Sequence, residues 1–148
     1  MWTWFHKLSS PPHFYRLSAS LIPWFGWFAA ALIIASLYGG LVMAPADYQQ
    51  GDSFRIIYVH VPSAWMSMFV YMVMASAGAV SLIWKMKLAD VVLKCAAPIG
   101  AAMTLLALIS GAVWGKPTWG TWWVWDARLT SELILFFLYL GFIGLTSA

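Results

Sequence analysis

Long stretches without a charged side chain are the feature that most restricts how this chain can fold. No charged residue lies between Arg16 and Asp47, and none lies from Val61 to Trp84. Roughly 20 apolar residues, rising 1.5 Å each in a helix, cross the ~30 Å hydrocarbon core of a bilayer. The two stretches are long enough for this, so the chain is predicted to be an all-α integral membrane protein.

The amino-acid composition agrees with a membrane protein. Charged residues make up 9% of the chain, and hydrophobic residues make up 63%, whereas a soluble domain carries about 25% charged residues. The net charge of +3 is too small to indicate a nucleic-acid partner. Cys95 is the only cysteine, which excludes an intrachain disulfide.

Four transmembrane helices are predicted, over residues of about 21–43, 61–84, 91–113 and 129–148. Pro23 and Pro62 fall in the first turns of the first two helices, where the missing backbone donor is harmless. Residues 1–20 are expected to form a tail along the membrane surface. Residues 1–148 are thus expected to be a single transmembrane domain with an external loop over residues 114–128.

The distribution of lysine and arginine predicts how the helices are oriented. The tail and the second connection carry five of these residues: Lys7, Arg16, Lys85, Lys87 and Lys94. The first and third connections carry three: Arg55, Lys116 and Arg128. Cytoplasmic segments carry the excess of positive charge, so the amino terminus is expected in the cytoplasm. An even number of crossings separates His60 from the 114–128 loop, so both are expected on one side, the non-cytoplasmic one.

The segment from Trp114 to Trp125 contains five of the chain's 11 tryptophans. These are Trp114, Trp119, Trp122, Trp123 and Trp125. Two glycines and a proline interrupt helical and strand periodicity there, which predicts an ordered loop. An aromatic belt at the membrane interface is the simpler interpretation, but a belt needs scattered tryptophans at helix ends. A flat platform for a planar ligand is the favoured interpretation.

Candidate binding residues flank two of the predicted helices. His60 is expected immediately before the second helix, with Arg55 five residues earlier. Asp126 is placed as the N-cap of the fourth helix, where Arg128 and Glu132 can pair as i,i+4 neighbours. Each residue also has a plain structural interpretation. Arginines anchor helix ends at headgroups, an aspartate can act only as a cap, and a lone histidine at a helix start is usually an interface residue.

Haem is the ligand whose chemistry suits this set of residues. Tryptophans can hold a flat macrocycle, Arg55 and Arg128 can bind two propionates, and His60 can ligate iron through a neutral nitrogen. The positive dipole at a helix start disfavours a protonated imidazole. No CxxCH attachment motif and no nucleophile–base pair is present. A carrier of non-covalent haem b is therefore expected, and not an enzyme.

Two stretches resemble a known family. The sequence Trp-Gly-Thr-Trp-Trp-Val-Trp-Asp-Ala-Arg-Leu-Thr-Ser-Glu, from Trp119 to Glu132, resembles the WWD signature of the haem-handling proteins of cytochrome c maturation. Ala44-Pro-Ala-Asp-Tyr-Gln-Gln-Gly and Arg55-Ile-Ile-Tyr-Val-His-Val-Pro are similar to the first external loop of the CcmC branch of that family. The similarity covers essentially all 148 residues. It implies that His60 is one of two axial haem ligands and that the WWD loop is the external haem platform.

The resemblance also implies a location and a set of partners. The location is the bacterial inner membrane, with His60 and the WWD loop on the periplasmic face. Haem would be presented there and passed to the haem chaperone CcmE. The further partners implied are the ATP-binding-cassette subunits CcmA and CcmB, the small protein CcmD, and membrane lipid.

The chain departs from the family pattern in two ways. The family has six spans and a second external histidine in a later loop, whereas no histidine follows His60 here. Only 16 residues follow Glu132, and they reach about 24 Å as a helix. The sequence is therefore expected to be part of a longer chain.

An alternative function is a structural or electron-transfer subunit of a membrane complex with no role in haem delivery. Electron transfer would require histidines that face each other within the bundle, and none of the four predicted helices contains a histidine at membrane depth. A structural subunit would use the tryptophans only as a belt, and its loop would tolerate exchange for other aromatic residues.

Overall fold

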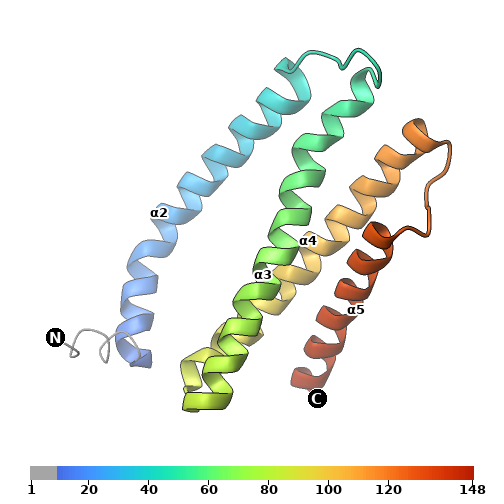
Figure 1. Ribbon diagram of the computed structural model, residues 1–148. Coiled ribbons are helices and arrows are strands. Elements are labelled where there is room, and N and C mark those ends of the chain that lie inside the picture. Colours follow the sequence, from blue (N-terminus) through green and yellow to red (C-terminus); the bar gives the residue numbers. More distant parts are fainter. Residues whose placement is uncertain (1–9) are drawn as a thin grey trace.

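The computed structural model describes residues 10–148, and these residues form an all-helical structure (Figure 1). The long helices are α2 (Pro11–Tyr38), α3 (Ile57–Trp84), α4 (Lys87–Trp119) and α5 (Ala127–Ser147). A π-helical turn, η1 (Gly39–Met43), extends α2, and a 3-10 turn, η2 (Asp52–Ile56), leads into α3. All four long helices are apolar and long enough to cross a membrane. The predicted fold class and the four predicted spans are confirmed.

Helices α3, α4 and α5 pack together, whereas α2 stands apart over most of its length (Figure 1). The buried face of α4 is built largely from small residues: Ala97, Gly100, Ala101, Thr104, Ala107 and Gly111. Small residues allow close approach of helix backbones where lipid supplies no hydrophobic drive for association. Helix α2 has no buried residue. Its extension η1 contacts the start of α3, where Gly40 lies directly against the Tyr58 ring.

Polar contacts fix α5 against α3. The Ser67 hydroxyl, fully buried, donates to Glu132 Oε1 at 2.7 Å, and the Tyr139 hydroxyl donates to the Ser67 carbonyl at 2.7 Å. Glu132 was expected beside Arg128, but no ion pair joins them in the part of the chain that the structure describes. The reason is that each has another partner: Ser67 for Glu132, and Asp126 for Arg128.

Helix α2 begins at Pro11, earlier than the predicted start near residue 21. Two successive prolines occupy its first positions, where a fixed φ favours a helix and a missing donor costs nothing. Pro23 consequently lies inside the helix and not in its first turn. Residues 11–20, expected as a surface tail, are helical, and the rest of that predicted tail, residues 1–9, lies outside the described residues.

Helix α4 continues to Trp119, well beyond the predicted end near residue 113. Pro117 removes one backbone donor, but the helix persists through it, and the Thr118 hydroxyl donates to the Trp114 carbonyl at 2.7 Å. Gly120, with φ of 79°, ends the helix by donating its N–H to the Lys116 carbonyl. Only residues 120–126 of the predicted 114–128 loop are non-helical.

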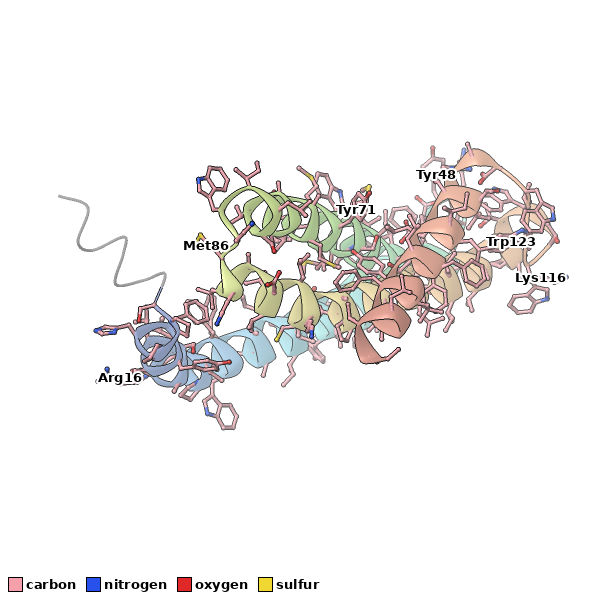
Figure 2. All side chains as sticks on the ribbon, turned by 90° about the horizontal axis from the view of Figure 1, so that it is seen from below. Arg16, Tyr48, Tyr71, Met86, Lys116 and Trp123 are labelled. Atoms are coloured by element: carbon pink, nitrogen blue, oxygen red, sulfur yellow. The ribbon has the colours of Figure 1, made fainter. Side chains whose placement is uncertain are left out.

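Helix α3 begins at Ile57, so His60 lies in its first turn and not before it. The connections at residues 44–56 and 120–126 lie at the same end of the bundle, opposite the α3–α4 turn (Figure 1). Figure 2 shows Tyr48, Lys116 and Trp123 gathered at this end and Arg16 and Met86 at the other. The structure thus brings His60 and the tryptophan loop to one end of the molecule, as the sequence predicted.

Candidate functional site

A cavity of about 300 Å³ opens at this end of the bundle. It is bounded by the first turn of α3, the last turns of α4 and the first turn of α5. Four predicted site residues line it: His60, Trp114, Trp119 and Arg128. Its other lining residues were not predicted from the sequence: Gln50, Gly111, Gly115, Thr118 and Leu129. Its volume is at the lower end of the range for small-molecule sites, ~300–1,000 Å³.

The His60 ring is held by α4 through one nitrogen. Nδ1 lies 3.1 Å from the Ala107 carbonyl oxygen and 3.1 Å from Ser110 Oγ. A carbonyl can only accept, so Nδ1–H donates to it, and the lone pair of the neutral ring is on Nε2. Nε2 makes no hydrogen bond within residues 10–148. Metal-ligating histidines are commonly oriented by such a second contact.

Gly111 makes the space that this ring occupies. A Cβ atom at this position would lie 3.0 Å from His60 Cε1 and 3.7 Å from a methyl group of Leu129. Three helices therefore meet at Gly111, and a larger residue there would press against the imidazole.

Trp114 forms a fixed aromatic wall beside His60. The two ring centroids are 5.7 Å apart in an edge-to-face arrangement, and Phe54 packs against the same indole at 6.3 Å. The indole Nε1 donates to Gln50 Oε1 at 2.8 Å. The tryptophan is thus held on both its apolar and its polar sides.

Arg128 reaches the cavity from the start of α5. Its guanidinium carbon lies 5.6 Å from the Trp119 ring centroid, and its NH2 nitrogen lies 2.8 Å from Asp126 Oδ2. Asp126 is the N-cap that the sequence predicted, since its Oδ1 accepts the Leu129 N–H at 2.8 Å. This backbone hydrogen bond, and then the bond from Arg128, hold the pKa of Asp126 below its ordinary value. The arginine side chain remains 78% exposed and accessible to a ligand.

Arg55 lies at the same end of the molecule but not among the residues that line the cavity. It donates to the Leu41 carbonyl at 3.0 Å and pairs with Asp52 at 3.3 Å, so it ties η2 to η1. Its Nε is buried and has no hydrogen-bond partner in the described chain.

The remaining tryptophans form an external group on the loop at residues 120–126. Trp123 and Trp125 pack edge to face at 5.4 Å, and Lys116 Nζ lies 6.0 Å from the Trp122 ring centroid. Trp122 and Trp125 are 56% and 74% exposed. The buried Nε1 of Trp123 has no acceptor within residues 10–148. The structure therefore divides the five predicted tryptophans into a cavity pair, Trp114 and Trp119, and this external group.

Some site residues had a detectable sequence signal and others had none. Gly111 and Gly115 have the small-xxx-small spacing typical of close helix contacts, and this spacing could have identified the cavity face of α4. Gln50 and Ser110 act through partners 64 and 50 residues away in the chain. Nothing in the local sequence predicts such contacts.

Comparison with known proteins identifies the family of this chain. A family model described as "Heme exporter protein C" (CcmC) matches residues 4–148. The chain is 55% identical over 148 residues to Heme exporter protein C of Haemophilus influenzae, and 51% identical to that of Escherichia coli K12. The protein of that name from Bradyrhizobium diazoefficiens is 51% identical over 141 residues, covering 95% of this chain and 53% of the relative.

The Haemophilus and Escherichia alignments cover 100% of this chain but 60% of each relative, so the chain spans about 60% of their length. The expectation that this is not an enzyme agrees with the family's description as an exporter. With four apolar helices and a family match over residues 4–148, this multi-pass membrane protein belongs to the heme exporter protein C (CcmC) family.

Proposed function

We propose that this protein binds haem at the end of the bundle that carries His60 and delivers it to a haem chaperone during cytochrome c maturation. The observation that carries the proposal is the cavity that His60 shares with two tryptophans and an arginine. The His60 imidazole is oriented through Nδ1, so that Nε2 is the nitrogen available to a ligand.

The residues present fit non-covalent haem b. His60 Nε2 would ligate the iron, Trp114 and Trp119 would contact the apolar macrocycle, and Arg128 would bind a propionate. Arg55 remains a predicted propionate partner because it lies at the same end of the molecule, although it is outside the residues that line the cavity. Iron supplies the ligation chemistry, and the protein supplies orientation and an apolar enclosure.

The external tryptophan group is the proposed delivery surface. Trp122 and Trp125 are large and exposed, next to the cavity rather than within it. Exposed aromatic residues of this size are typical of interaction surfaces. We propose that this face is periplasmic and contacts CcmE, while CcmA, CcmB and CcmD are partners in the same assembly.

The visible absorption spectrum tests the haem site. The wild-type chain, purified in detergent and titrated with haem b, is expected to show a haem band that weakens and shifts in His60→Ala. His13→Ala is a matched control, because His13 is exposed on α2 near the opposite end of the bundle. A His60→Ala spectrum identical to the wild type would contradict the role of this histidine.

Transfer of haem to purified CcmE tests delivery separately. Replacing Trp122 and Trp125 by alanine is expected to slow transfer while leaving the haem spectrum of the loaded protein unchanged. Trp24→Ala and Trp27→Ala form the control, since both residues are highly exposed on α2 but lie away from the loop. Equal transfer rates for the loop pair and the control pair would refute the delivery surface.

A further inference from the structure

Gln50 is held in place by its own loop. Asp47 Oδ1 accepts hydrogen bonds from the backbone N–H groups of Gln49 and Gln50, at 2.9 and 2.8 Å. Asp47 and Gly51 exchange backbone hydrogen bonds across the turn, and the Ser53 hydroxyl donates to the Gln50 carbonyl at 2.6 Å. The backbone of Gln50 is therefore fixed from both sides, and its side chain extends from a rigid support.

The Trp114 indole determines which way the Gln50 amide points. An indole N–H can only donate, so the atom 2.8 Å from it must be the amide oxygen. The amide NH2 is then directed away from the indole, and it makes no hydrogen bond within residues 10–148. Two donor hydrogens of a half-buried, oriented side chain are thus available at the cavity wall.

The same cavity holds Arg128 and His60. A ligand bound through His60 would meet a guanidinium and a neutral amide donor on the walls around it. None of the described residues that line the cavity carries a carboxylate. Oriented amide donors and arginine are the groups that bind carboxylates in proteins.

We propose that Gln50 is a ligand-binding residue: its amide nitrogen donates to a carboxylate of the bound ligand, while its amide oxygen holds Trp114. This inference rests on the proposed function, in which the ligand is haem and its carboxylates are propionates. Gln50 thereby contacts both Trp114, which forms the aromatic wall of the site, and the carboxylate of the bound ligand.

Two substitutions separate the two tasks of this side chain. Gln50→Glu keeps an acceptor for Trp114 but replaces the donor with a negative charge. Gln50→Met removes both the acceptor and the donor at similar size. Dissociation constants for haem b and for haem dimethyl ester, which has no free carboxylate, are measured for each variant in detergent at about pH 8.

The expected result is a loss of haem affinity of about tenfold or more in Gln50→Glu, the size of a hydrogen bond to a charged group. The affinity of Gln50→Glu for the dimethyl ester should equal that of the wild type, because Trp114 keeps its acceptor. Gln50→Met should weaken both ligands. If Gln50→Glu leaves haem affinity unchanged, or weakens both ligands equally, the inference is overturned.

Gln49→Glu is the matched control. It adds the same charge one residue away, on an exposed side chain that does not line the cavity, and should leave both affinities unchanged. A loss in Gln49→Glu equal to that in Gln50→Glu would show a general charge effect and would overturn the inference. A wild type that binds neither ligand would instead refute the proposed function, so the two failures are distinguishable.

Discussion

Asp126 serves two partners through its two carboxylate oxygens. Oδ1 accepts the Leu129 N–H and caps α5, whereas Oδ2 accepts two hydrogen bonds from Arg128, at 2.8 and 3.1 Å. The cap requires only an oxygen acceptor, and the pairing with arginine gains from a negative charge. The two contributions can therefore be separated by substitution and by pH.

Asp126→Asn is expected to keep the cap and lose the ion pair, whereas Asp126→Ala loses both. The folded-state pKa of Asp126 lies below its ordinary value of 3.8. Its charge therefore stabilises the fold above about pH 4, and this contribution is lost as the pH falls through the folded-state pKa. Unfolding temperatures in detergent, followed by the helical signal, should be highest for the wild type, lower for Asp126→Asn and lowest for Asp126→Ala at neutral pH. The difference in unfolding temperature between the wild type and Asp126→Asn should shrink in acid. A difference that stays constant below pH 4 would count against this account.

At the scale of single residues, the sequence predicted those roles that depend on near neighbours. The Asp126 cap follows from its place before an apolar helix. The partner of Arg128 could not be predicted, because the spacing allowed it to pair with either of two carboxylates. Tertiary packing places Glu132 against Ser67, and Arg128 therefore pairs with Asp126. The role of Gln50 depends on a contact 64 residues away, which no local pattern encodes.

At the scale of helices, the apolar pattern predicted how many there are but not where each ends. Hydropathy marks the membrane-buried part of a helix, and backbone hydrogen bonding can continue past it into the interface. Gly115 and Pro117 predicted a break in α4, yet the helix ends only at Gly120, where φ is positive. As a result Trp114 and Trp119 are wall residues of a cavity on α4 and not part of a loop.

Gly100 in α4 provides a test of how tightly the helices pack. A Cβ atom at this position would overlap the Tyr139 ring of α5, whereas a Cβ atom at Gly78 of α3 would meet nothing within 4 Å. Gly100→Ala should lower the free energy of unfolding by about 1–3 kcal/mol, the usual cost of overpacking. Gly78→Ala should be neutral or stabilising by up to about 1 kcal/mol. Reversible unfolding in mixed detergent measures both, and equal stability of the two variants would contradict the close α4–α5 contact.

At the scale of the whole molecule, positive charge is divided between the two ends of the bundle. Arg16 and the α3–α4 turn, with Lys85 and Lys87, lie at one end, and Lys116 lies at the other, beside the tryptophan loop (Figure 2). The short connection between α3 and α4 carries basic residues and no aromatic cluster. At the end with the cavity, two of the basic residues, Arg55 and Arg128, form ion pairs with aspartates. The positive-inside rule predicts that the Arg16 end faces the cytoplasm.

Single-cysteine labelling tests this orientation. Tyr48→Cys and Met86→Cys, each made in a Cys95→Ser background, mark opposite ends of the bundle (Figure 2). In intact spheroplasts a membrane-impermeant maleimide is expected to label position 48, which is 91% exposed, and to label position 86 only after lysis. The Cys95→Ser background without a second substitution controls for non-specific labelling. The reverse pattern would place His60 and its cavity on the cytoplasmic face, where a ligand could be loaded but not handed to a periplasmic acceptor. The topology therefore decides whether the cavity can serve delivery at all.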